Sequence, residues 1–142
     1  IIQSQLKSVG IDVEIRSYDW GTFYGDIKEG RFQMYSLSWV GLKIPDIFYY
    51  VFHSKSIPPH GANRGRLNDY NVDSILELAK FEASLDKQAL YYKDLQKYLL
   101  DILPYIPLWY EDNILVSKSD IKGYKLNSDG NFDSLRYVTK NN

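Results

Sequence analysis

The chain has 142 residues, no cysteine, and 17 basic against 18 acidic side chains, which leaves a net charge of −1. This length is typical of one domain, and the balanced charge argues against a surface built to bind nucleic acid. The lack of cysteine excludes disulfides and thiolate chemistry, and no apolar run approaches the roughly 20 residues of a membrane span. Because the chain starts with Ile1 inside a helical pattern, we expect a fragment of a longer protein.

The first forty residues predict a strand–helix–strand unit. Residues 1–10 have the pattern of a helix end that stops at a glycine, and residues 11–16 alternate apolar with charged side chains, as a half-exposed strand does. A helix is expected from an N-cap at Asp19 to Gly30, and residues 32–39 are predicted to form a second strand. A unit of this size is normally parallel with a right-handed crossover.

The loops that follow these two strands, residues 17–20 and 39–42, would then share one sheet edge, where open α/β sheets bind ligands. Each loop contains a tryptophan. Trp20 falls on the apolar stripe of the helix and is expected to pack there, whereas Trp39, next to Gly41, fits packing and ligand contact equally well.

Residues 40–70 are rich in proline and glycine and predict loops around one short helix from Asp46 to about His53. Asn63 and Arg64 offer donors for an anion or a polar ligand, although a solvated loop explains them as well. The two histidines, His53 and His60, are expected to be surface or loop residues. Their spacing fits no metal motif, so we predict no metal site.

The final third predicts two amphipathic helices. The first is capped by Asp69 or Asn71, and the second begins at Ser84 or Asp86 and stops at Pro104. The side chains expected on their buried faces are Val72, Ile75, Leu76, Ala79, Tyr91, Leu95, Tyr98, Leu99 and Ile102.

Two short extended segments are expected after the helices, at residues 106–110 and 114–116, and residues 121–124 are expected to lead into a turn. Residues 127–142 begin with a polar stretch and are expected to be poorly anchored.

Known catalytic arrangements such as a nucleophile elbow, a phosphate loop or a zinc-protease helix are absent from the sequence. Asp46, Glu111 and Asp112 lie near predicted loop edges and could form a carboxylate pair for general acid–base chemistry. With 18 acidic residues such proximity is expected by chance, so the prediction is a protein that is not an enzyme.

The order of several short motifs resembles the extracytoplasmic solute-binding proteins of peptide and nickel ABC transporters, also called bacterial extracellular solute-binding protein family 5. The motifs run along nearly the whole chain. They are Leu6–Ile15, Tyr18–Phe23, Gly30–Met34, Ser38–Gly41, Pro45–Phe48, Gly61–Arg64, Asn71–Asp73, Tyr92–Gln96, Pro104–Leu108 and Ile121–Tyr124.

The resemblance implies a periplasmic-binding-protein-like lobe of the α/β class, with a mixed, mostly parallel sheet flanked by helices. Residues 1–126 would be most of the carboxyl-terminal ligand-binding lobe, and residues 127–142 a return segment toward the other lobe. It further implies non-catalytic capture of a peptide or related polar solute by closure of two lobes, and delivery to an ABC permease. Such a protein would be a periplasmic or extracytoplasmic monomer without cofactor, in some members lipid-anchored.

The resemblance also implies a ligand wall. In peptide-binding members a tryptophan at the position of Trp39 packs on the ligand, and an acid three residues later holds the peptide's α-ammonium. Here that position is Leu42, so we expect another acid, Asp46 or Glu111, to substitute, or a different ligand. The residues expected at the ligand are Tyr18, Trp39, Val40, Gly41, Leu42, Asp46, Asn63, Arg64, Trp109, Tyr110 and Glu111.

Two alternatives remain at this point. One is a sensory or adhesive module that uses the lobe without transport. The other is a hydrolase that uses Asp46 and Glu111, which requires the two carboxylates to meet in a pocket.

Overall fold

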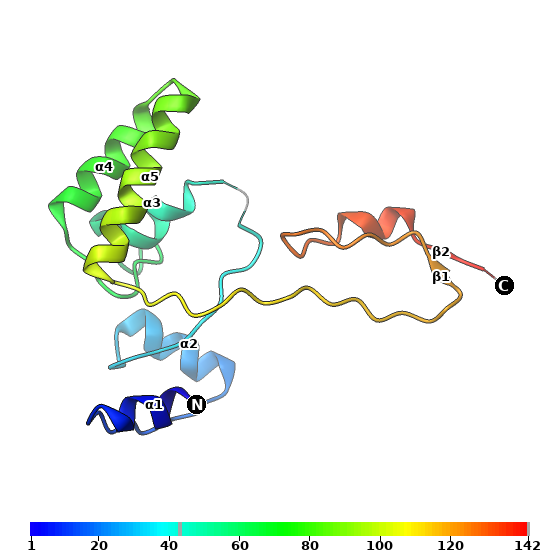
Figure 1. The fold of residues 1–142 in the computed structure, drawn as a ribbon, viewed down its shortest axis with the longest axis horizontal. Helices are drawn as coiled ribbons and strands as arrows, with labels where there is room; N and C mark the ends of the chain where they lie inside the picture. The colour runs from blue at the N-terminus through cyan, green and yellow to red at the C-terminus, as the bar shows by residue number, and fades with distance from the viewer. Residues whose placement is uncertain (43, 142) are drawn as a thin grey trace. The chain divides into compact units, whose positions relative to one another are not determined.

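A computed structural model describes residues 1–42 and 44–141 of the chain. The chain divides into two compact units, one from Ile1 to Tyr35 and one from Ser36 onward. We describe each unit by itself. Figure 1 shows the course of the chain and the labels of its elements.

The first unit contains helices α1 (Ile2–Ser8) and α2 (Trp20–Glu29). The Asp19 carboxylate accepts the Thr22 backbone N–H at 3.1 Å, and Gly30 ends α2 in the left-handed conformation, with φ at 76°. The predicted N-cap at Asp19 and the predicted stop at Gly30 are both confirmed. Both depend on capping within the helix's own sequence. Trp20 stacks on Tyr24 within the same helix, with ring centroids 5.5 Å apart, but its side chain is exposed.

The second unit is built around α3 (Ile47–Phe52), α4 (Tyr70–Phe81) and α5 (Leu85–Ile102), with a 3-10 turn η1 (Ser54–Ser56) after α3. Helices α4 and α5 lie side by side, and α3 packs against them (Figure 1). The buried residues of this core are Val72, Leu76, Ala79, Tyr92, Leu95 and Leu99. The predicted apolar stripes are confirmed except that Ile102 is exposed and Tyr92 takes the most buried aromatic position.

Side-chain caps fix where these helices begin. Asp69 accepts the backbone N–H groups of Asn71 and Val72, and Ser84 accepts that of Lys87 at 3.5 Å. Of the two alternatives predicted for each helix, Asp69 caps α4 and Ser84 caps α5. Helix α5 ends when Leu103 takes a left-handed conformation directly before Pro104.

His53 lies in the connection between α3 and η1, as the prediction of a surface or loop residue allows, but only 1% of its surface is exposed, so it is not a surface residue. Its Nδ1 accepts the Lys55 backbone N–H at 3.0 Å, and its Nε2 lies 3.4 Å from Oε1 of Glu77 on α4. The ring also stacks on Tyr49 at 4.1 Å. The sequence pattern misses the burial because α4, which carries Glu77, packs over this connection from a distant part of the sequence. His60 is exposed, as expected.

The carboxyl-terminal part forms a small sheet, in which β1 (Ile121–Lys122) pairs antiparallel with β2 (Thr139–Lys140). The turn η2 (Asp133–Tyr137) precedes β2. Gly123 has a φ of 86°, and a Cβ there would collide with the Tyr137 carbonyl oxygen. Thr139 and Lys140 pair with β1, and the Asn141 backbone N–H donates to the Asp120 carbonyl oxygen, so residues 139–141 are anchored. Poor anchoring of the rest of the segment stays a prediction.

The larger, mostly parallel sheet expected from the sequence does not appear in residues 1–42 and 44–141, where β1 and β2 form a two-stranded antiparallel sheet. Segments 11–16, 32–39, 106–110 and 114–116 carry no strand assignment. A strand exists only with a ladder partner, and alternation of side chains predicts an extended chain without supplying that partner. None of the helices in the described ranges is both long enough and apolar enough to span a membrane.

Candidate functional site

Trp39 and Arg64 lie together in the second unit. The Arg64 guanidinium carbon is 5.0 Å from the centroid of the Trp39 ring, which is the geometry of a cation–π contact. Arg64 is buried, with 8% of its surface exposed, and Trp39 is half-buried. A cation buried to this extent keeps its position better than one on a flexible exposed side chain, so it can define one side of the tryptophan.

Asn63 holds the loop that carries Arg64. Its Nδ2 donates to the carbonyl oxygens of Phe52, His53 and Leu67, and its Oδ1 accepts the Leu67 backbone N–H at 2.9 Å. Only 1% of Asn63 is exposed. Its side chain therefore positions the loop, and direct contact of Asn63 with a ligand stays a prediction.

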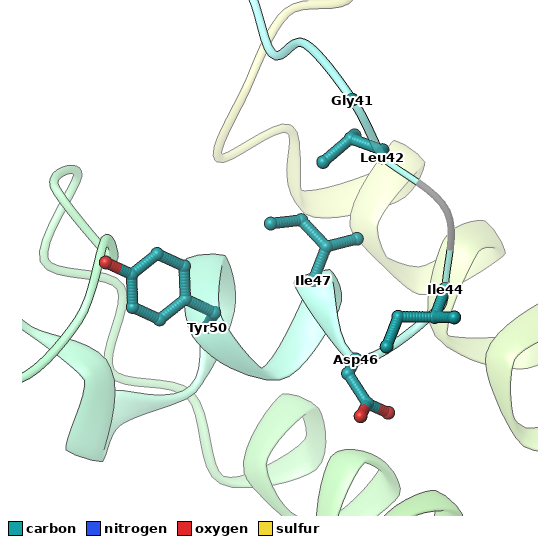
Figure 2. A pocket seen from close by; sticks show the side chains of 6 residues that line it. All are labelled: Gly41, Leu42, Ile44, Asp46, Ile47 and Tyr50. Carbon is teal, nitrogen blue, oxygen red and sulfur yellow. The ribbon is translucent and has the colours of Figure 1, made fainter. Parts of the chain in front are cut away.

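A hollow of about 350 Å³ follows Trp39 along the chain. Figure 2 shows the residues that line it, which are Gly41, Leu42, Ile44, Asp46, Ile47 and Tyr50. The Ile47 side chain points toward the side of Leu42, and the surface is almost entirely apolar. The hollow is suited to an apolar group.

Asp46 contributes the one carboxylate of this lining, but Figure 2 shows it pointing away from Leu42 and Ile47. Its charge acts instead on the helical core. The pKa of Tyr92 on α5 is raised, first because the phenol is buried and second because the Asp46 carboxylate opposes a phenolate.

Glu111 is brought to the residue before Trp39 from a distant part of the sequence. The Ser38 hydroxyl donates to its Oε1 at 3.1 Å. Two aromatic side chains directly before Glu111 are strongly exposed, Trp109 at 67% and Tyr110 fully. This stretch therefore presents a carboxylate and two rings to solvent.

The structure joins some of the predicted residues of the second unit by direct contacts. Trp39 meets Arg64, and Glu111 meets the residue before Trp39, while Val40 is exposed at 77%. Tyr18 is half exposed in the first unit.

The two carboxylates of the hydrolase alternative, Asp46 and Glu111, make separate contacts, and no hydrogen bond within the described ranges connects them. No finding favours that alternative.

Sequence reasoning missed four residues of this region, Ser38, Ile44, Ile47 and Tyr50. The apolar run after Pro45 was available as a signal, but it equally predicts a buried helix face. The Ser38–Glu111 contact spans 73 positions and leaves no local signal. In residues 1–42 and 44–141 no cluster of three histidine or acidic side chains is placed to hold a metal ion.

Comparison with known proteins shows which proteins the chain is similar to. Residues 1–57 match the family of bacterial extracellular solute-binding proteins, family 5 (middle). The chain also shares its fold with a solved periplasmic binding protein, the ABC transporter-associated DppA of Helicobacter pylori in complex with the peptide STSA. The TM-score is 0.81 at 27% identity, over 98% of this chain and 28% of that one.

Two curated peptide-binding proteins are similar to most of this chain. The periplasmic murein peptide-binding protein MppA of Escherichia coli is 27% identical over 137 residues, 94% of this chain and 25% of its own length. Di/tripeptide-binding protein 2 of Pseudomonas aeruginosa is 27% identical over 127 residues, 89% of this chain and 24% of its own length. The comparisons confirm the resemblance of this chain to the peptide-binding members of solute-binding protein family 5. The chain spans about a quarter of the length of these relatives.

Proposed function

We propose that this chain is part of the ligand-binding lobe of a two-lobe solute-binding protein that captures a small peptide, or a related polar solute, and delivers it to an ABC permease. The observation that carries the proposal is the similarity over 98% of the chain to DppA, which was solved with a bound peptide. The relatives named for murein peptide and for di- and tripeptides support the same ligand class.

The proposed mechanism is capture without catalysis. A ligand that contacts both lobes stabilises the closed form by its higher affinity for that form, and the closed form then docks on the permease. The protein would act as a periplasmic or extracytoplasmic monomer, in some settings attached to lipid, and would need no cofactor.

Residues 1–126 would form the lobe and residues 127–142 the return segment. The extended segments that remain unpaired here would join the mostly parallel sheet of the complete lobe. Their apolar side chains support this, since Ile15, Ile114 and Val116 are exposed at 68%, 81% and 89% and are better suited to a packed sheet than to water.

Within the lobe, Trp39 would form the ligand wall, with Arg64 fixed against its ring and Val40, Gly41 and Leu42 continuing the surface. Tyr18, Trp109 and Tyr110 would add aromatic contacts from other segments, because exposed rings with little rotational freedom are efficient at binding. The hollow beside Leu42 would take an apolar side chain of the ligand.

The experiment is mass spectrometry of the small molecules released when the two-lobe protein carrying this chain is purified and denatured. We expect peptides of a few residues. A non-peptide solute, released reproducibly and in stoichiometric amount, would contradict the proposed ligand class while leaving the solute-binding fold intact.

A further inference from the structure

Arg64 lies against the ring of a tryptophan and is almost completely withdrawn from solvent. Its guanidinium carbon is 5.0 Å from the centroid of the Trp39 ring, and 8% of the Arg64 surface is exposed. A ligand that stacks on this indole must therefore use the other face of the ring. What Arg64 does for such a ligand rests on the proposed function, because it concerns the affinity for a peptide that binds at Trp39.

The loop between η1 and α4, which carries Arg64, is tied by its backbone to α3 and η1. The Ala62 N–H donates to the Tyr50 carbonyl oxygen at 2.9 Å. The Asn63 N–H donates to the Ser56 carbonyl oxygen, also at 2.9 Å. The backbone directly before Arg64 is therefore fixed to α3, whose Tyr50 lines the hollow shown in Figure 2.

A glycine allows the loop to approach η1 this closely. A Cβ at Gly61 would lie 2.6 Å from Cβ of Ser56 and 2.7 Å from its carbonyl oxygen, which is closer than non-bonded atoms can approach. At Gly65, on the other side of Arg64, a Cβ would meet Cε1 of Tyr105 at 3.6 Å, an ordinary van der Waals distance. Closure of the loop therefore requires a glycine at position 61 but not at position 65.

The Asn63 side chain joins the two sides of the closed loop. Its Nδ2 donates to the Leu67 carbonyl oxygen at 2.7 Å, and its Oδ1 accepts the Leu67 N–H at 2.9 Å. The backbone is thus held both before and after Arg64. Because this backbone is fixed and the arginine is buried, the position of the guanidinium is set by the loop before any ligand arrives.

We propose that Arg64 is a positioning residue, which acts on the ligand through Trp39 and not by a contact of its own. The guanidinium held over one face restricts the motion of the indole in the free protein. A ring that is already ordered loses less entropy on binding, so the affinity rises for any ligand that stacks on it. This gain does not depend on the charge of the ligand, whereas a guanidinium bonded to the ligand would favour a free carboxylate.

The first measurement needs no ligand. The two-lobe protein carrying this chain is labelled with fluorotryptophan, and the fluorine NMR signal of Trp39 is assigned with Trp39→Phe. We expect Arg64→Met, which keeps an unbranched stem and removes the cation, to shift or broaden this signal. Gly61→Ala should do the same, because the loop can no longer close in its place, and Gly65→Ala should leave the signal unchanged. The other tryptophan signals show whether each variant is folded.

The second measurement is calorimetry with trialanine and trialanine amide, which share the same body and differ in the charge at the carboxyl end. Arg64→Met should weaken both peptides by a similar factor of roughly 2- to 10-fold, the cost of ordering one side chain on binding. Gly61→Ala should also weaken both peptides, whereas Gly65→Ala should bind both with wild-type affinity.

Three results would overturn the positioning role. They are an unchanged Trp39 signal in Arg64→Met, a loss of affinity confined to trialanine, and equal effects of Gly61→Ala and Gly65→Ala. The second of these would show that the guanidinium bonds directly to the carboxylate of the ligand. Failure of the wild type to bind either peptide overturns the proposed peptide binding and the effect on affinity with it, while the fluorine signal separately shows whether Arg64 orders Trp39.

Discussion

The helices and the extended segments of the second unit bury their apolar side chains to very different extents. On α5, Leu95 is fully buried against α4, whereas in the extended stretch after α5 Trp109, Ile114 and Val116 are exposed at 67%, 81% and 89%. A helix satisfies its own backbone and needs only one neighbour for its apolar face, but a strand needs at least one paired strand and a cover on its apolar face. The helices therefore bury their apolar faces within this chain, whereas the extended segments leave apolar side chains exposed that another strand or a ligand could cover.

The largest expected effect concerns the helical side of this comparison. Leu95→Ala should lower the free energy of unfolding by roughly 2–5 kcal/mol, because it removes buried methyl groups and leaves a cavity. Urea unfolding of the protein carrying this chain measures the change. The control is Leu100→Ala on the same helix, where the side chain is 59% exposed. Equal costs for the two variants would show that Leu95 does not lie in the core.

Asn63→Ala probes the loop between η1 and α4, which carries Arg64 to the ring of Trp39. It should cost about 1–3 kcal/mol, because the carbonyl oxygen of Phe52 and both backbone groups of Leu67 lose the Asn63 side chain as a partner, while the His53 carbonyl keeps the Ser56 N–H. Asn68→Ala, at an exposed position of the same loop, is the control. If both variants unfold at the same urea concentration as wild type, Asn63 does not hold this loop.

The start of α4 gives the next effect. Asp69→Ala should cost about 1 kcal/mol, since two backbone N–H groups and the Tyr98 hydroxyl lose their acceptor. Asp69→Asn keeps a capping oxygen and should recover most of that loss. Thermal or urea unfolding of the two variants measures the difference. An asparagine variant as unstable as the alanine variant would argue against stabilisation of α4 by capping.

The smallest effect is a pH dependence at the surface of the same helices. The Lys55 ammonium donates to Oε1 of Glu77 at 2.9 Å and holds the pKa of Glu77 below its ordinary value, with a smaller contribution from His53. A lowered folded-state pKa gives stability that is present above the unfolded-state pKa and is lost as the pH falls through the folded-state pKa.

Glu77→Gln should therefore make stability fall less between neutral and acidic pH than it does in wild type. The measurement is urea unfolding at a series of pH values. Glu29→Gln, at an exposed position of α2, is the control and should follow the wild-type curve. A wild-type pH profile in Glu77→Gln would contradict the effect of the Lys55–Glu77 pair on stability.

The helices depend on local contacts and the extended segments on distant ones, and this difference decides what can be predicted from the sequence. The first residues of α2, α4 and α5 can be predicted from the N-caps Asp19, Asp69 and Ser84, because a capping side chain bonds to backbone N–H groups within three residues. The apolar stripes of α4 and α5 follow from the helical period in the same way. Local rules are sufficient for these elements.

The candidate site depends on contacts that local rules do not contain. The Trp39–Arg64 stack spans 25 positions and the Ser38–Glu111 hydrogen bond spans 73. The sequence proposed Trp39, Arg64 and Glu111 as members of the site but could not place them against one another. It also could not show that His53 is buried or that Asn63 bonds to the backbone, since both depend on how the loop after α3 folds back.

The central claim is that this chain binds a peptide ligand at Trp39. The most direct test is calorimetric titration of trialanine into the two-lobe protein carrying Trp39→Ala, with Trp20→Ala as a control that also removes a partly exposed indole. We expect Trp39→Ala to weaken trialanine binding by at least about tenfold, as is typical of an aromatic residue at the centre of a binding site, and Trp20→Ala to leave the affinity unchanged. Wild-type affinity in Trp39→Ala would contradict peptide binding at Trp39.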